Sequence, residues 1–268
     1  MQPRPTRTRL SDRRADTNTT NGAGHAGGVI HVDDRDHVRT LTLDRPEARN
    51  AFDQQQYHDL ATWLAASADD SDIHVVVVTG TGPSFSAGQD LKEMALLAAG
   101  QGPVGGATGF PALLQQLESF GKPLIAAVNG SATGIGATIL LHCDIVIIAE
   151  TARLRMPFAE LGVPPEAGSS VLLPAAIGWQ RAAELLFTAR WVAGPEAVDL
   201  GMALRCVPLD DLAATAAALA ADISRHSPAA VQVSKRLMLA GRADVSARAR
   251  ERENLGFVEL GFGGGRSD

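Results

Sequence analysis

The feature that most constrains the fold is a continuous apolar run, Leu124–Val128, which Pro123 precedes and Asn129–Gly130 follows. Such a run is typical of a strand that is buried on both faces. After a glycine-spaced turn, the pattern changes to one that favours a helix from Gly134 to Leu141. The chain is therefore expected to place a buried strand, a tight turn and a helix in succession.

The same order of elements recurs elsewhere in the chain. Ile73–Thr79 predicts a second buried strand, and Val29–Val32 with Val38–Leu43 predicts a β-hairpin around the polar turn Asp33–His37. Asp53 predicts a helix N-cap, followed by one apolar helical face made of Tyr57, Leu60, Ala61 and Leu64. Strand, loop, helix and strand in this order indicate an α/β core with parallel strands.

Beyond Glu166 the pattern is helical. It predicts helices over Ser169–Ile177, Gln180–Thr188 and Pro195–Leu200, and two later helices with apolar faces at Leu212, Ala216, Leu219 and Ile223 and at Val231, Ser234, Leu237 and Met238. We divide the chain into a disordered tail (1–28), a core (29–200) and a C-terminal helical region (201–268). Residues 100–109 are glycine-rich and predict a mobile loop.

Composition excludes several classes of function. The formal net charge of -6 offers no electrostatic basis for binding nucleic acid or an anionic membrane. No apolar run approaches the roughly 20 residues that span a bilayer. The two cysteines, Cys143 and Cys206, lie in apolar stretches, which favours reduced thiols in a cytoplasmic compartment over a disulfide or a metal site.

Two glycine-bearing turns carry the first chemical signal. Small residues at Ser86–Gly88 allow a sharp turn that presents the amide of Gln89, and Gly134 with Gly136 leaves the amide of Ile135 open at a helix start. Taken alone, the first turn is better explained as an ordinary strand-to-helix connection. Together, two such turns can direct two backbone amides at one oxygen, which is the arrangement that stabilises an oxyanion or enolate.

These segments resemble a known family. Phe85–Met94, Ala127–Gly130, Gly134–Gly136 and Cys143–Asp144 are similar to signatures of the crotonase superfamily, the enoyl-CoA hydratases and isomerases. The resemblance implies a spiral of repeated ββα units, trimers or pairs of trimers, and a thioester carbonyl between the amides of Gln89 and Ile135. Coenzyme A would then be part of the substrate, with no permanently bound cofactor and no metal. The family often has glycine where this chain has Ile135.

The catalytic acids narrow the expected reaction. Hydratases of this family use two glutamates, at positions that correspond here to Thr138 and Phe158, and neither residue can transfer protons as a carboxylate does. The run Met156–Ser170 instead resembles Δ3,Δ2-enoyl-CoA isomerases and the ring-opening isomerase of phenylacetate breakdown, which implies that Glu166 is the single catalytic acid. The alternative role for Glu166 is an acid in the first turn of a helix. Glu160 is a competing acid, for which a surface or salt-bridged position is favoured.

The resemblance also implies a substrate-binding set: Ala87, Gly88, Asp90, Lys92, Arg49, Gly134 and Phe158. Arg49 and Lys92 match positions near the CoA-binding loops, although solvated surface charge explains each of them equally well. Family members usually continue into a basic final helix, so CoA binding or the substrate lid is expected to differ here. We interpret the chain as a cytoplasmic homotrimeric or hexameric isomerase. The alternatives are a hydratase, another crotonase-type reaction, or an acyl-CoA binder without catalysis.

Overall fold

A computed structural model describes residues 29–98, 101 and 108–262. Its centre is a six-stranded sheet with the strand order β1-β2-β3-β5-β7-β10. The pairs from β2 to β10 are parallel, and only β1 with β2 is antiparallel. The strands are β1 (Ile30–Arg35), β2 (Val38–Leu43), β3 (Val75–Gly80), β5 (Leu124–Val128), β7 (Ile145–Ala149) and β10 (Arg205–Val207). Every residue of β5 is buried, as the apolar run predicted.

The N-terminal hairpin is longer than predicted. Its strands continue to Arg35, and the turn contains only Asp36 and His37, with φ angles of 49° and 67°. Positive φ at both central residues is the geometry that suits the twist of a two-residue hairpin. The predicted turn Asp33–His37 was too wide because Asp33 and Asp34 pair with β2 while their side chains stay exposed.

A second, four-stranded sheet runs in the order β4-β6-β8-β9. Its strands are β4 (Ser84–Ser86), β6 (Ser131–Thr133), β8 (Arg153–Arg155) and β9 (Val192–Ala193). Three times the chain passes from a strand of the large sheet to a strand of the small sheet and then to a helix. These helices are α2 (Leu91–Ala98), α4 (Ile135–Thr138), which continues into the 3-10 helix η2 (Ile139–His142), and α5 (Phe158–Leu161). The predicted α/β fold of repeated ββα units is therefore confirmed.

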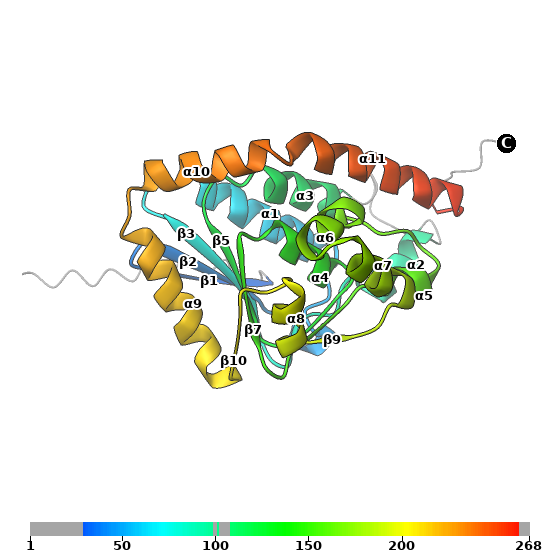
Figure 1. The fold of residues 1–268 in the computed structure, drawn as a ribbon, viewed down its shortest axis with the longest axis horizontal. Coiled ribbons are helices and arrows are strands. Elements are labelled where there is room, and N and C mark those ends of the chain that lie inside the picture. The colour runs from blue at the N-terminus through cyan, green and yellow to red at the C-terminus, as the bar shows by residue number, and fades with distance from the viewer. Residues whose placement is uncertain (1–28, 99–100, 102–107, 263–268) are drawn as a thin grey trace, which may run out of the picture.

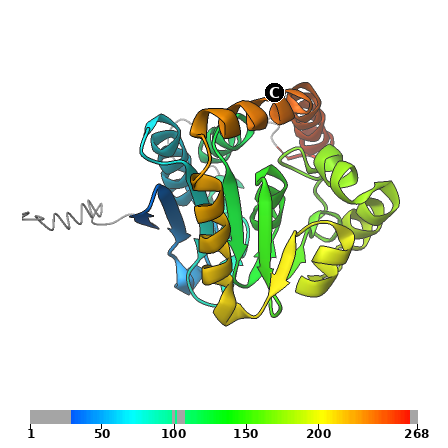
Figure 2. The ribbon, with the colours of Figure 1, turned by 60° about the vertical axis from the view of Figure 1, so that its left-hand side comes forward.

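Helices cover the large sheet on both sides. The helix α9 (Leu209–Ser224) lies across one face and contacts β2, β3, β5 and β7 (Figures 1 and 2). On the other side, α1 (Gln54–Asp69) packs on α3 (Gly109–Ser119). The N-cap prediction for α1 is confirmed, because Asp53 accepts a hydrogen bond from the backbone amide of Gln56. The remaining helices are the 3-10 helix η1 (Pro46–Ala48), α6 (Ser169–Ile177), α7 (Trp179–Thr188) and α8 (Gly194–Leu200).

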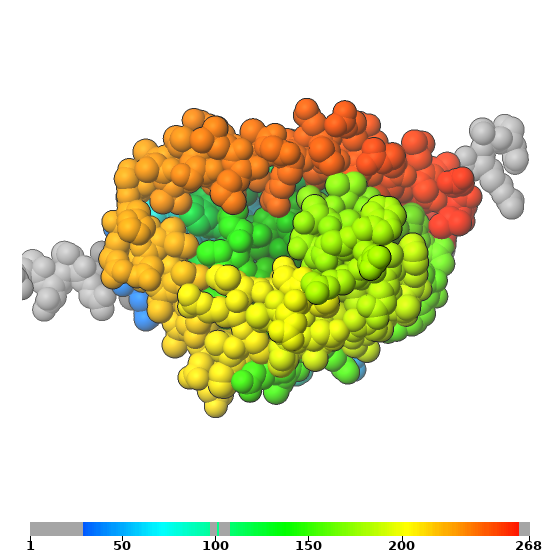
Figure 3. Space-filling view, in the orientation of Figure 1, coloured from blue at the N-terminus to red at the C-terminus, as the bar shows by residue number. Residues whose placement is uncertain are grey.

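The last two helices form one long rod along the edge of the molecule (Figure 1). They are α10 (Pro228–Ala240) and α11 (Ala243–Glu259). In the space-filling view the surface is hollowed between this rod, α9 and the helices α6 to α8, and residues from the middle of the chain form its floor (Figure 3).

The helix predicted around Val231–Met238 is present as α10, but most of its predicted apolar face is exposed. Ser234, Leu237 and Met238 are exposed, and the buried residue of this helix is Lys235. The Nζ atom of Lys235 donates to the carbonyl oxygen of Lys122 at 2.6 Å and to Asp144 at 2.8 Å. A charged side chain can occupy this buried position because its ammonium group donates hydrogen bonds to these acceptors.

Two expectations concern segments outside the described residues. These are the disordered tail at 1–28 and nearly all of the glycine-rich loop at 100–109. The three-part division of the chain and the trimerisation role of residues 201–268 stay predictions. Within the described ranges, no helix has the length and apolar character needed to cross a membrane.

Candidate active site

The two glycine-bearing turns meet where β4 and β6 end. These strands run parallel, so both turns leave the small sheet at the same edge. Gly88 has φ +94°, and a Cβ atom placed on it would lie 2.7 Å from the carbonyl oxygen of Thr133. Gly134 has φ +54° and faces the Cα atom of Gly88 from the other turn. Both positions favour glycine because both have a positive φ angle. At Gly88 a side chain would also collide with the backbone of the other turn.

The amides of Gln89 and Ile135 stay open beside this contact. The neighbouring amides form backbone hydrogen bonds. The amide of Asp90 donates to the carbonyl oxygen of Phe52 at 2.8 Å, and that of Gly134 donates to the carbonyl oxygen of Arg155 at 3.0 Å. Within the described residues, the amides of Gln89 and Ile135 have no such acceptor. Ile135 begins α4, so its amide is one of the unpaired donors of a helix N-terminus.

The departure from glycine at Ile135 has a structural explanation. The residue is only 1% exposed and belongs to the main hydrophobic core. Its side chain is therefore directed away from solvent, while the backbone amide remains available at the turn. The arrangement offers two donors near each other, although their role toward a thioester oxygen stays a prediction.

A buried tyrosine stands beside the first amide turn. The hydroxyl of Tyr57 donates to the side-chain oxygen of Gln89 at 2.6 Å. Its ring stacks on Phe52 and meets Phe110 edge-on. Burial, together with the negative charge of Glu166, raises the pKa of Tyr57 well above its usual value, so the hydroxyl stays protonated. Sequence reasoning placed Tyr57 only in the core, because a phenol on an apolar helical face gives no further signal.

Glu166 lies in the loop between α5 and α6, after Pro164 and Pro165. Burial raises the pKa of its carboxyl group to about 8, and the nearby carboxylate of Glu253 adds to the rise. The negative charge of Glu166 contributes to the raised pKa of Tyr57, whose hydroxyl donates to Gln89. A common site of Glu166 with the amides of Gln89 and Ile135 stays a prediction.

The alternative role of Glu166 as a helix cap is filled by another residue. Glu253, on α11, accepts hydrogen bonds from the amides of Gly168 at 2.7 Å and Ser170 at 2.9 Å. These amides belong to the N-terminus of α6, and the N-cap residue itself, Gly168, contributes no side-chain bond. Among the residues that the structure describes, the Glu166 carboxyl group forms no hydrogen bond or ion pair.

The Glu166 loop is also fixed from the side of η2. The Nε2 atom of His142 lies 2.8 Å from the carbonyl oxygen of Ala167. Since a carbonyl only accepts, Nε2 carries the proton and donates. Burial lowers the pKa of His142 to about 4, so the ring is neutral near pH 7. His142 therefore has a structural role, holding the loop that contains Glu166.

Neither Glu160 nor the two positions that correspond to the hydratase glutamates, Thr138 and Phe158, provides a free buried carboxylate among the described residues. Glu160 is exposed and forms an ion pair with Arg155, which agrees with its expected salt-bridged position. Thr138 and Phe158 are both buried, and the Thr138 hydroxyl donates to the carbonyl oxygen of Ile135. Neither provides a carboxylate.

The predicted substrate-binding residues fall into two groups. Gly88 and Gly134 lie in the turns, Phe158 is buried at the start of α5, and the amide of Ala87 donates to the carbonyl oxygen of Arg49 at 2.9 Å. Asp90 has a clear structural role, because it caps α2 and binds Arg45 at 3.2 Å.

The two predicted cation sites lie at the surface. Arg49 and Lys92 are both exposed, and neither takes part in an ion pair among residues 29–98, 101 and 108–262. Free exposed cations suit a phosphate-bearing substrate as well as plain solvation. Their role in binding coenzyme A stays a prediction.

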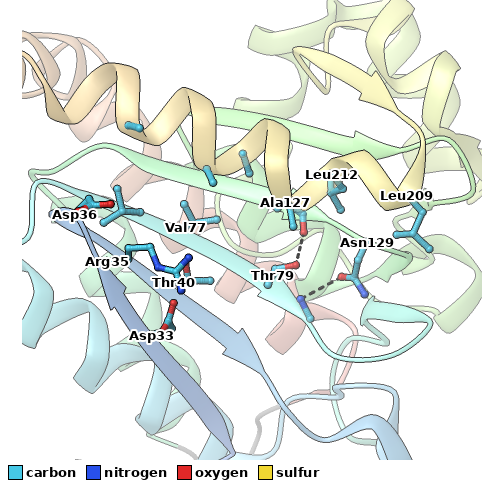
Figure 4. A pocket seen from close by; sticks show the side chains of 16 residues that line it. Asp33, Arg35, Asp36, Thr40, Val77, Thr79, Ala127, Asn129, Leu209 and Leu212 are labelled. Atoms are coloured by element: carbon cyan, nitrogen blue, oxygen red, sulfur yellow. Dashed lines mark hydrogen bonds between the residues drawn. The ribbon is translucent and has the colours of Figure 1, made fainter. Parts of the chain in front are cut away.

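A cavity of about 580 Å³ lies elsewhere, between α9 and the large sheet (Figure 4). Its walls are mainly alanines of α9 and side chains of β2 and β3. Two polar side chains along it are paired: the Thr79 hydroxyl donates to Ala127, and Asn129 accepts from Gly80. Asp33, Arg35, Asp36 and Thr40 also line it. This cavity does not include Gln89, Ile135 or Glu166.

Comparison with known proteins agrees with the fold. The sequence profile of the enoyl-CoA hydratase/isomerase family matches residues 33–261. A solved enoyl-CoA hydratase/isomerase from Pseudoalteromonas atlantica T6c superposes with a TM-score of 0.82 at 34% identity, covering 87% of this chain and 91% of that one. A sheet-and-helix spiral of this kind defines the crotonase fold.

Two curated relatives come from Escherichia coli K12. A 2,3-dehydroadipyl-CoA hydratase is 37% identical over 209 residues, which is 77% of this chain and 80% of the relative. A 1,2-epoxyphenylacetyl-CoA isomerase is 38% identical over 186 residues, which is 68% of this chain and 71% of the relative. The chain belongs to the enoyl-CoA hydratase/isomerase family and is an acyl-CoA-processing enzyme of the crotonase superfamily.

Proposed function

We propose that the protein is an enoyl-CoA isomerase that moves the double bond of a 3-enoyl thioester to the 2-position. Glu166 acts as the single acid–base group. The amides of Gln89 and Ile135 hold the thioester oxygen on which negative charge develops. Backbone donors aimed at a developing oxyanion contribute several kcal/mol to a rate, typically about 3 kcal/mol for one donor.

The reaction needs one proton to move between two carbons. The Glu166 carboxylate removes a proton from C2, the electron pair shifts toward the thioester oxygen, and a dienolate forms between the two amides. The protonated carboxyl group then returns the proton to C4, and the electrons shift back to give the conjugated 2-enoyl product. No water is consumed, so no second acid is required.

One observation carries this proposal: loss of solvation raises the pKa of the half-buried Glu166 carboxyl group to about 8. A group poised near neutral pH can both take and return a proton. Thr138 and Phe158 occupy the positions at which a hydratase of this family needs glutamates. This favours an isomerase over a hydratase.

Hydration is the second candidate, because one similar protein from E. coli is a 2,3-dehydroadipyl-CoA hydratase. It would require a second group that activates water. The carboxylates of Glu93 and Asp53 also influence Tyr57, yet each is engaged, Glu93 with the amide of Gln54 and Asp53 with Arg45.

Purified protein should be incubated separately with a 3-enoyl and a 2-enoyl thioester. Conjugated product from the first substrate supports the proposal. A hydroxyacyl product from the second would support the hydratase, and binding without turnover would leave a non-catalytic acyl-CoA binder.

The variant Glu166→Gln tests the assigned base. Its turnover of the 3-enoyl substrate should fall by roughly 10²–10⁴-fold, the usual contribution of a general acid–base group. Glu160→Gln is the matched control, because this exposed acid pairs with Arg155 and should leave turnover unchanged. Full activity of Glu166→Gln would remove Glu166 from its role.

A further inference from the structure

A second acid is buried within reach of Glu166. Glu253 is only 5% exposed, although a glutamate is rarely buried without a partner. Its two oxygens accept from the amides of Gly168 and Ser170, at 2.7 and 2.9 Å. No arginine or lysine pairs with this carboxylate among the described residues. It is therefore held by backbone amides at the start of α6, which follows the Glu166 loop.

The position of Glu253 links the C-terminal helix to that loop. Glu253 lies on α11, which packs against α6. The amide of Gly168 comes two residues after Glu166, and Ala167 between them has a left-handed backbone with φ 58°. A non-glycine residue in this conformation persists only when its surroundings hold it there. Glu253 holds the loop from one side and His142 from the other.

We propose that Glu253 is a positioning residue for the Glu166 carboxyl group, holding its loop by two hydrogen bonds and placing a second carboxyl group near it. The catalytic part of this assignment rests on the proposed function, in which Glu166 is the acid–base group. It gives the C-terminal helix a direct part in proton transfer, in addition to any packing role.

The other ionisable groups nearby contribute less charge. Tyr57 on α1 and His142 on η2 are both neutral near pH 7, because burial raises the pKa of the first and lowers that of the second to about 4. The cations closest to His142 come from the rod of α10 and α11, and they are Arg242 and Arg250. Arg250 is neutralised by Glu118 of α3 at 2.8 Å. The charge that acts most strongly on Glu166 is therefore that of Glu253.

The test is a titration of the Glu166 carboxyl group by NMR, in full-length protein with labelled glutamate side chains. The Glu166 signal is assigned by its loss in Glu166→Gln. In Glu253→Gln the midpoint should fall by about one pH unit, because a like charge has been removed. Glu251→Gln, an exposed position on the same helix, should leave the midpoint unchanged.

Glu253→Asp keeps the charge and shortens the side chain. Its midpoint should stay near that of the unmodified protein, while turnover falls because the loop is held less well. Glu253→Asp also tests the inference if Glu253→Gln does not fold. The inference is overturned if folded Glu253→Gln titrates like the unmodified protein, or if Glu253→Asp shifts the midpoint downward as far as a charge loss would.

Kinetics provide the second readout. The pH profile of kcat/KM should move to lower pH in Glu253→Gln, in parallel with the carboxyl titration. A merely structural role would lower kcat without moving the profile. Because the titration is read without turnover, it separates a wrong assignment of Glu253 from a wrong choice of Glu166 as the base.

Discussion

The hydroxyl of Tyr57 lies 2.6 Å from the side-chain oxygen of Gln89 and donates a hydrogen bond to it. This bond joins α1 to the turn that presents the first open amide. A parallel bridge between Phe52 and Gln89 joins the same two segments through the backbone. The residue whose amide is assigned to the thioester oxygen is thus fixed by both its side chain and its main chain.

Tyr57→Phe tests the side-chain part of this connection. The ring packing on Phe52 and Phe110 is retained, but the Gln89 oxygen loses its donor. A net hydrogen bond contributes about 1 kcal/mol, so kcat/KM should fall by roughly 5-fold and stability by a similar free energy. Steady-state kinetics and urea unfolding measure the two effects. Unchanged values of both would show that Gln89 is held by its backbone alone.

Gly88→Ala tests the contact between the two turns. The new Cβ atom would lie 2.7 Å from the carbonyl oxygen of Thr133, and the backbone has φ +94°, so the turns must separate. Displacing one of the two amides should lower kcat by about 10²–10³-fold, as for the loss of an oxyanion donor. Activity toward the 3-enoyl thioester is the measurement.

Gly201→Ala is the matched control for backbone strain. Its φ is +87°, but the nearest atom to a new Cβ lies 3.5 Å away, which is an ordinary contact. It should lose about 1 kcal/mol of stability and keep its activity. If both alanine variants lost activity equally, general strain would explain the result and the turn contact would not.

The sequence predicted those parts of the site that depend on local backbone chemistry. The turns at Gly88 and Gly134 and the buried strand β5 are set by residues close together in the chain, so their patterns are readable. The N-cap of α1 by Asp53 is local in the same way.

Residues that act across the fold were not predicted. Glu253 contacts Gly168 and Ser170 from positions 85 and 83 residues away in the chain, and Lys235 reaches Asp144 across 91 residues. On their own helices both read as exposed charges. Only the docking of α10 and α11 shows which acceptors and donors they meet, and no periodicity in the sequence carries that information.

Lys235→Met tests the anchor of α10. The substitution leaves the carbonyl oxygen of Lys122 without its donor and removes the cation from Asp144. Breaking one side of a buried ion pair costs about 3–5 kcal/mol, and partial exposure of Asp144 places the expected loss near the lower end. Urea denaturation measures it.

Arg236→Met removes an exposed charge from the next position of the same helix and should change stability by less than about 0.5 kcal/mol. The double variant Lys235→Met with Asp144→Asn should recover part of the loss, because no charge is then left unpaired. If Lys235→Met and Arg236→Met lost the same free energy of unfolding, Lys235 would not be the anchor of α10.

Glu166→Gln should have a pH-dependent effect on stability. The folded-state pKa of Glu166 is about 8, raised from 4.5, so between these values the folded chain holds a proton that the unfolded chain has released. Folding is therefore penalised increasingly as pH rises through this window, by about 1.4 kcal/mol per pH unit. Glutamine cannot ionise and avoids the penalty.

The free energy of unfolding of Glu166→Gln, relative to the unmodified protein, should thus increase by more than about 2 kcal/mol between pH 5 and pH 8. Urea denaturation at both pH values gives this difference. Glu160→Gln, which removes an exposed and paired acid, should show no comparable increase. A difference that stays constant across the window would mean that Glu166 ionises as a solvated carboxylate does, and the burial that makes it a suitable base would then be absent.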